Sequence, residues 1–140
     1  MEKDSLVKTI QLVPVEFIHQ AWEKCGHMIE SAMAHAKGEC SAEQLKVFLV
    51  QGQHQLLVFL EDTEIVGAVE FMYDDTPNDR IFYINAIGGK TSKEHTDQMF
   101  AFAKSTGCTA VRGCARESVA RLWRQKYDFE SIYIMVEKRL

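Results

Sequence analysis

The sequence has no excess of basic residues. It contains 16 Lys and Arg against 20 Asp and Glu, which gives a net charge of -4 at pH 7. A chain of this sign lacks the bulk charge with which proteins bind a phosphate backbone regardless of its sequence. The composition therefore indicates no nucleic-acid partner, and any basic patch has to be a local one.

Long apolar runs are also missing. No stretch approaches the roughly 18 residues that a membrane-spanning helix requires. The first apolar stretch follows a start of mixed charge and is interrupted by Lys8 and Pro14, so the sequence predicts no signal-peptide core. From these absences we expect a cytoplasmic protein with no membrane partner.

The cysteines and histidines show none of the spacings of a metal site. No C-x-x-C pair and no close Cys/His pairing is present among the four cysteines, which are Cys25, Cys40, Cys108 and Cys114. We expect four reduced thiols. His19, His27 and His35 are eight residues apart, so they drift around a helix instead of aligning at positions i and i+4. No metal site is predicted.

The chain does contain enough apolar residues for one core. It has 140 residues, of which 46% are hydrophobic and 26% charged. This length is close to that of a common single domain, and the hydrophobic share is too high for a disordered chain. No internal repeat or low-complexity segment is present. We therefore expect residues 1–140 to form a single domain.

Apolar periodicity and turn residues predict ten elements. Gly26 is expected to bend or break the first helix, Lys37 and Gly38 to stop it, and a capping box of Ser41 and Gln44 to open the second. In order, the elements are a strand at 9–13, helices at 15–36 and 41–50, strands at 55–60, 65–73 and 80–87, a helix at 93–105, a strand at 108–114, a helix at 117–127 and a strand at 132–137.

The order β-α-α-β-β-β-α-β-α-β restricts the fold. Three consecutive strands form an antiparallel meander, whereas the later β-α-β-α-β part requires a crossover and hence some parallel pairing. We expect an α+β fold built on a mixed sheet.

The late part of the chain resembles the GNAT superfamily of acyl-CoA-dependent N-acyltransferases, and the similarity of element order covers nearly the whole chain. Residues 104–129 are similar to the family's helix, Gly-Cys strand and Asn-x-x-Ala…Tyr-x-x-x-Gly-Phe helix, with Gly107, Cys108, Ala120 and Phe129 in matching positions. The departures are Glu117 for the asparagine, Arg124 for the tyrosine that commonly protonates the departing thiolate, and Asp128 for the glycine. The resemblance implies a central, mostly antiparallel mixed sheet with helices on both faces.

The resemblance also implies an acyl-CoA site around residues 86–92. It implies that the backbone of Ala86 and Ile87 pairs with the pantetheine arm and that the turn binds the pyrophosphate, a turn made of Gly88, Gly89, Lys90, Thr91 and Ser92. Amides at a helix N-terminus suit phosphate chemically. The family's usual slots fall at Ile87, Lys90 and Ser92, so both glycines are displaced toward the strand. The alternative is that Gly-Gly only permits a tight turn and Ser92 only caps a helix.

Arg124 has two interpretations. Its guanidinium could contact a coenzyme phosphate or a carboxylate, but it cannot donate a proton near neutral pH. The alternative is a solvated charge in the run formed by Arg121, Arg124 and Lys126.

Two residues are candidates for acid, base or positioning work. Glu70 lies on the second hairpin strand, and burial can raise the pKa of a carboxyl toward neutrality. Asn85 is polar in an otherwise apolar strand, although a structural amide with its hydrogen bonds satisfied would look the same in the sequence.

Two functions follow from the resemblance. The first is an N-acyltransferase that moves an acetyl group from acetyl-CoA to an amine of a small molecule or protein, with a homodimer as a common assembly of the superfamily. The second is a GNAT-like domain that has lost chemistry and serves as a binding or structural module, such as a phage accessory or virion-associated protein in a host cytoplasm or virion. A cleft between the strands at 80–87 and 108–114 would favour the first, and a filled cleft the second.

Overall fold

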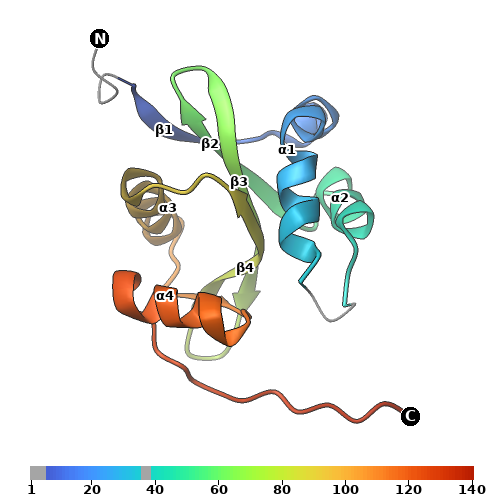
Figure 1. Ribbon diagram of the computed structural model, residues 1–140, viewed down its shortest axis with the longest axis vertical. Helices are drawn as coiled ribbons and strands as arrows, with labels where there is room; N and C mark the ends of the chain where they lie inside the picture. The colour runs from blue at the N-terminus through green and yellow to red at the C-terminus, as the bar shows by residue number, and fades with distance from the viewer. Residues whose placement is uncertain (1–5, 36–38) are drawn as a thin grey trace.

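One five-stranded sheet lies between two pairs of helices in the computed structural model, which describes residues 6–35 and 39–140 (Figure 1). Helices α1 and α2 cover one face of the sheet, and α3 and α4 lie on the other. The elements are β1 (Lys8–Leu12), a 3-10 turn η2 (Val15–Phe17), α1 (Ile18–Met33), α2 (Ala42–Val50), β2 (Gln55–Glu61), β3 (Glu64–Asp75), β4 (Arg80–Gly89), α3 (Lys93–Ser105), β5 (Ala110–Gly113) and α4 (Glu117–Tyr127).

The sheet order is β1-β2-β3-β4-β5. The first four strands pair antiparallel with their neighbours, whereas β4 and β5 pair parallel. This arrangement confirms the predicted mixed, mostly antiparallel sheet with helices on both faces.

Alternating side chains divide the core into two layers. Even-numbered positions of β2, such as Leu56 and Val58, pack under α1 and α2, while Leu57 and Phe59 pack toward α3. A helix on each face therefore buries one set of each strand's side chains, as the apolar pattern of the central strands requires.

The helix ends follow local signals in the sequence. Ser41 accepts a hydrogen bond from the Gln44 amide, and the Gln44 side chain accepts one from the Ser41 amide, so the predicted capping box is confirmed. Helices α3 and α4 begin and end where the periodicity predicts. The stop signal assigned to Lys37 and Gly38 lies outside the described residues.

The predicted bend at Gly26 is wrong. Helix α1 runs without a break through this residue, and a β-carbon there would lie 2.6 Å from Trp22 Nε1. The glycine gives room to the indole one turn earlier, and the rest of the helix holds its geometry.

The predicted turn at Gly88 and Gly89 is also misplaced, because both glycines belong to β4. They continue the antiparallel register opposite Ala68 and Gly67. The turn proper begins at Lys90.

The predicted closing strand at 132–137 is absent. The chain after α4 has no strand, and Tyr133, Ile134, Met135 and Val136 are 83–90% exposed. A strand requires a neighbouring strand to pair its amides and carbonyls, and this segment has none within the described chain (Figure 1). None of the described helices is long and apolar enough to cross a membrane.

Candidate functional site

Strand β4 parts from β5 halfway along its length. The two strands pair from Ile81 opposite Ala110 to Ile84 opposite Gly113, and the described chain offers no β5 partner beyond that point. At the same point, β4 carries one extra residue: Phe71 of β3 lies opposite Ile84, and Glu70 lies opposite Ala86, which leaves Asn85 as a bulge. A bulge re-aims the backbone locally. The β5 side of β4 is therefore unpaired from Asn85 onward.

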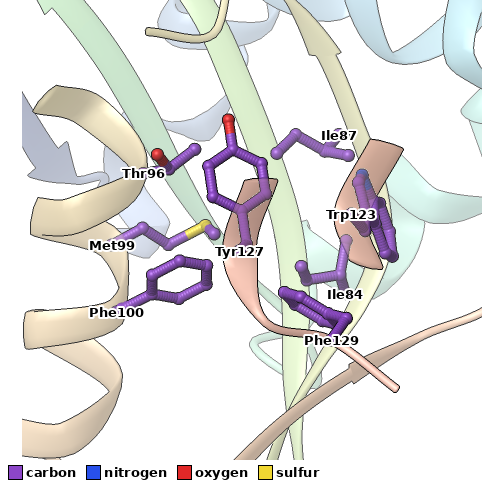
Figure 2. A pocket seen from close by; sticks show the side chains of 8 residues that line it. All are labelled: Ile84, Ile87, Thr96, Met99, Phe100, Trp123, Tyr127 and Phe129. Carbon is purple, nitrogen blue, oxygen red and sulfur yellow. The ribbon is translucent and has the colours of Figure 1, made fainter. Parts of the chain in front are cut away.

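Aromatic side chains occupy most of the space beside this parting. Trp123, Tyr127 and Phe129 reach toward Ile84 and Ile87, and together with Thr96, Met99 and Phe100 they leave an apolar cavity of about 20 Å³ (Figure 2). A β-carbon on Gly113 would lie 3.1 Å from the Trp123 ring, so the indole rests directly on β5. A ligand in this space requires Trp123 to move. No residue of α4 is fully buried, so the helix that carries Trp123 is loosely held.

The predicted phosphate turn retains only part of its amides. The Lys90 amide donates to the Val66 carbonyl at 2.7 Å, which joins Lys90 to β3. The described residues offer no acceptor to the amides of Thr91 and Ser92, which directly precede the N-terminus of α3. The amides of Thr91, Ser92 and the first turn of α3 are therefore the ones open to an anion at this turn, where the helix dipole adds positive charge.

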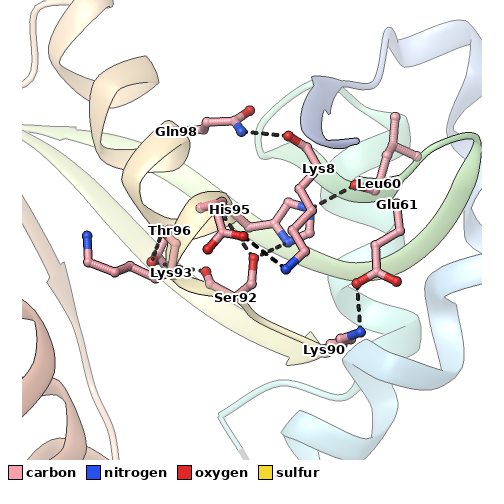
Figure 3. Close-up of polar contacts among 10 residues, drawn as sticks. Lys8, Leu60, Glu61, Lys90, Ser92, Lys93, His95, Thr96 and Gln98 are labelled. Carbon is pink, nitrogen blue, oxygen red and sulfur yellow. Dashed lines mark hydrogen bonds and ion pairs between the residues drawn. The ribbon is translucent and has the colours of Figure 1, made fainter. Parts of the chain in front are cut away.

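Each lysine around this turn has a carboxylate partner, and Figure 3 shows the pair of Lys90 with Glu61. The pairs are Lys90 with Glu61 at 2.7 Å, Lys93 with Asp97 at 2.7 Å and Lys8 with Glu94 at 2.9 Å. The pairs of Lys93 and Lys8 lie at the surface, where such contacts are weak. The Glu61 side chain is only 10% exposed, so moving Lys90 away would leave a largely buried carboxylate without this partner. A phosphate therefore competes more easily for Lys93 than for Lys90.

His95 fixes the N-terminus of α3 to the sheet. Its ring is fully buried and stacked on Phe59, with the ring centroids 5.1 Å apart. Nε2 donates to the Leu60 carbonyl at 2.8 Å, and Nδ1 lies 2.9 Å from Ser92 Oγ, which in turn accepts from the His95 amide. Because Leu60 lies at a register shift between β2 and β3, its carbonyl needs this partner. One buried histidine thus positions the turn that follows β4.

Replacing His95 with Phe should keep the stacking and remove both side-chain hydrogen bonds. We expect a loss of about 2 kcal/mol in the free energy of unfolding, because the Leu60 carbonyl is left unsatisfied. Ser92→Ala removes the cap and the contact with Nδ1 but keeps the bond to the Leu60 carbonyl, and it should cost about 1 kcal/mol. Urea denaturation of both variants measures the difference, and an equal loss in the two would show that the Leu60 contact contributes nothing.

A row of polar side chains crosses the face of the sheet that α1 and α2 cover. Glu70 is fully buried, its Oε2 lies 3.1 Å from His54 Nδ1, and His54 Nδ1 lies 3.4 Å from Asn85 Nδ2. Glu70 Oε1 is buried without a hydrogen-bond partner. Burial raises the pKa of Glu70 to about 8 and lowers the pKa of His54. Near pH 7, the pair is therefore mostly uncharged.

The structure thus brings the two predicted catalytic candidates, Glu70 and Asn85, to one place and adds His54, which sequence reasoning missed. His54 stacks on Phe48 with centroids 4.6 Å apart. It also borders a cavity of about 160 Å³ between β1, η2 and the end of α2, lined by Leu12, Pro14, Leu49 and Gly52 among others. The row runs from the β4 bulge to this cavity, and no spacing in the sequence signals it.

Arg124 lies in a different setting from the turn. Its guanidinium contacts Glu117 at 2.5 Å and the Ser131 hydroxyl at 2.9 Å. Of the two alternatives, Arg124 thus contacts a carboxylate. It links Glu117, at the start of α4, with Ser131, in the segment that follows the helix. Tyr127, three residues later on α4, is the side chain that reaches the cavity beside β4 (Figure 2). Arg124, at the position of the family's tyrosine in the sequence pattern, therefore contacts Glu117 and Ser131 and does not line this cavity.

No protein-family model matches the sequence, and a comparison with curated proteins gave no match. Solved structures do share the fold. An aminoglycoside N-acetyltransferase in complex with CoA superposes with a TM-score of 0.69 at 9% identity, covering 100% of this chain and 99% of that chain. An aminoglycoside acetyltransferase from an uncultured soil metagenomic sample, in complex with sisomicin, gives 0.67 at 15% identity over 95% and 96% of the two chains.

A third similar structure is that of an enzyme whose name gives a protein as its acceptor. The ribosomal-protein-alanine N-acetyltransferase of Brucella melitensis biovar Abortus gives a TM-score of 0.62 at 16% identity, covering 94% of this chain and 100% of that chain. At such identities the likeness concerns the fold. The chain therefore has the GNAT fold that its sequence resembles.

Proposed function

We propose that this protein is an N-acetyltransferase that uses acetyl-CoA and acts on an amine of a small molecule or protein in the cytoplasm. The observation that carries the proposal is the parting of β4 from β5 at the Asn85 bulge, beside the N-terminus of α3. The similar structures include one with CoA and one with an aminoglycoside, which supports the class of both ligands.

In this proposal, the unpaired edge of β4 holds the acyl-CoA. The backbone of Ala86 and Ile87 pairs with the amides of the pantetheine arm, as a missing strand would. The amides of Thr91, Ser92 and the first turn of α3 bind the pyrophosphate, with Lys90 as a nearby cation. Gly88 and Gly89 contribute by letting β4 lie close to α1 and β3. Arg124 stabilises α4 through Glu117 and does not bind the coenzyme.

The chemistry is direct attack by the amine on the thioester carbon. The new C–N bond forms, the C–S bond breaks, the amine loses a proton and the departing sulfur gains one. Positioning supplies much of the rate in such a step. His54, which is neutral near pH 7, accepts the proton of the amine at Nε2, while the protonated Glu70 and Asn85 hold the imidazole through Nδ1. Tyr127 supplies the proton to sulfur, in place of the tyrosine that is missing at position 124.

Replacing Tyr127 with Phe tests the proposal. Release of free thiol from acetyl-CoA would be followed with a panel of amines that includes an aminoglycoside, a polyamine and a peptide amino terminus. We expect kcat to fall about 100-fold, as for loss of one proton donor, while the affinity for acetyl-CoA stays within twofold. An unchanged kcat would show that Tyr127 is not the proton donor.

A second candidate function is a GNAT-like module without catalysis. The small size of the cavity beside β4 favours it, because about 20 Å³ holds no acyl chain until Trp123 moves. The two functions separate in the same assay. Acetyl-CoA binding without thiol release for any amine favours the module, and turnover with one amine excludes it.

A further inference from the structure

The cavity beside His54 has the size of one compact apolar group. Its volume is about 160 Å³, close to the roughly 150 Å³ of an engineered apolar cavity that binds benzene. Leu49 and Ile18, both buried, line its inner part. Leu12 and Val15, which are 40% and 50% exposed, line its opening. A small molecule therefore reaches the inner wall from solvent without unfolding any part of the core.

The lining of this cavity is poor in polar groups. Among the described residues that line it, only His54 and Gln55 have polar side chains. Neither side chain is charged near pH 7, because burial lowers the pKa of His54 below its usual value. A molecule with several charges would lose water here without gaining an opposite charge, which is costly. The cavity therefore suits a ligand with an apolar body and one polar end, and it disfavours polyamines and aminoglycosides.

His54 gives the apolar wall one directed hydrogen-bonding atom. The imidazole stacks on Phe48, and the His54 amide donates to the Phe48 carbonyl at 3.2 Å, so the ring is held in place. Nδ1 faces Glu70 Oε2 at 3.1 Å and Asn85 Nδ2 at 3.4 Å. Nε2 has no hydrogen-bond partner among the described residues and is not one of their fully buried unpaired atoms. A ligand in the cavity can therefore reach Nε2.

We propose that this cavity binds the apolar part of the acceptor, and that the acceptor is a primary amine joined by a short carbon chain to a single aromatic ring or a branched alkyl group of that size. The inference rests on the proposed function for the amine and adds the group that carries it. With the ring against Leu49 and Ile18, the nitrogen lies at Nε2 of His54. Through Nδ1, the same imidazole contacts Asn85 at the β4 bulge, where the proposed coenzyme site begins.

Calorimetric titration with phenylethylamine in the absence of acetyl-CoA tests the cavity directly. We expect affinity about tenfold higher than for ethylamine, which has the same amine without the ring. Val15→Trp places an indole at the opening and should weaken the binding of phenylethylamine about tenfold. Val47→Trp makes the same change on α2 outside the cavity and should leave the affinity unchanged. Circular dichroism checks that both variants fold, which is expected because both valines are about half exposed.

Equal affinity for phenylethylamine and ethylamine, or an affinity that Val15→Trp leaves unchanged, would overturn the inference whatever the protein acetylates. Thiol release from acetyl-CoA separates the inference from the proposed function. We expect a higher kcat/KM for phenylethylamine than for ethylamine or spermidine, and Val15→Trp should raise the KM for phenylethylamine alone. Turnover of spermidine without phenylethylamine keeps the proposed function and overturns the inference. Binding of phenylethylamine that Val15→Trp weakens, without turnover of any amine, supports the cavity as the site of the ring and overturns the acetyltransferase.

Discussion

Replacing Gly88 with Ala should destabilise the protein by about 3 kcal/mol, as strong overpacking does. A β-carbon at this position would lie 2.3 Å from the carbonyl oxygen of Met28 and 2.9 Å from its carbonyl carbon. These are backbone atoms of α1, so no side chain can turn away to make room. Helix α1 has to move off β4, which loosens the core between them. Thermal denaturation should show a melting temperature lower by roughly 10 °C.

Gly107→Ala is the matched control for this substitution. Gly107 has a positive φ of 88°, but the nearest atom to an added β-carbon is Arg80 Cδ at 3.8 Å. Only backbone strain acts there, and its cost is about 1 kcal/mol. If the two variants lose the same stability, α1 does not approach β4 as closely as the structure has it. Contact with α1 would then not explain why position 88 is a glycine.

Replacing Glu70 with Gln should remove a dependence of stability on pH. The pKa of Glu70 in the folded protein is about 8, above the 4.5 of a free glutamate, because burial penalises the carboxylate. Above pH 4.5, the unfolded chain releases this proton while the folded chain keeps it. Folding stability therefore falls as pH rises through this window and levels off above pH 8. The slope approaches 1.4 kcal/mol for each pH unit.

His54 acts in the opposite direction and in a lower range. Its folded pKa lies below 6.5, so stability rises as pH increases up to that value. Between pH 6.5 and 8, the Glu70 contribution stands by itself, and we expect the wild type to lose about 2 kcal/mol. Urea denaturation at both pH values should show a much smaller loss for Glu70→Gln. Glu64→Gln, an exposed substitution on the same strand, should behave as the wild type. A wild type with flat stability over this range would mean that Glu70 is ionised.

Elements with local signals could be predicted from the sequence. The bounds of α3 and α4 and the capping box of Ser41 depend on residues within one or two turns of each other. The runs of apolar residues likewise predicted the three strands of the antiparallel meander at 55–60, 65–73 and 80–87. These features need no knowledge of what lies across the sheet.

The remaining features depend on distant contacts. Glu70 meets His54 because the register of β2 and β3 brings them together, and neither residue has a periodic partner in the sequence. Gly88 is needed because α1 passes over it, which no turn pattern reveals. The closing strand was predicted from its composition, but a strand forms only where another offers its edge.

The donors predicted for the turn after β4 need one change. The Lys90 amide, counted among the phosphate donors, donates to the Val66 carbonyl, so the proposed site uses the amides of Thr91 and Ser92. A charge at Gly89 would test the turn poorly, because its φ of 80° and the Val66 carbonyl 2.6 Å from an added β-carbon would disturb the fold as well. Thr91 is exposed and tests the turn without that disturbance.

Calorimetric titration of the protein with acetyl-CoA tests the acyl-CoA site most directly. We expect micromolar affinity, about -8 kcal/mol. Thr91→Glu places a negative charge beside the amides that bind the pyrophosphate and should weaken binding at least tenfold. Gln20→Glu adds the same charge at an exposed position of α1 and should leave the affinity for acetyl-CoA unchanged. No heat and no thermal shift at millimolar acetyl-CoA would contradict the account.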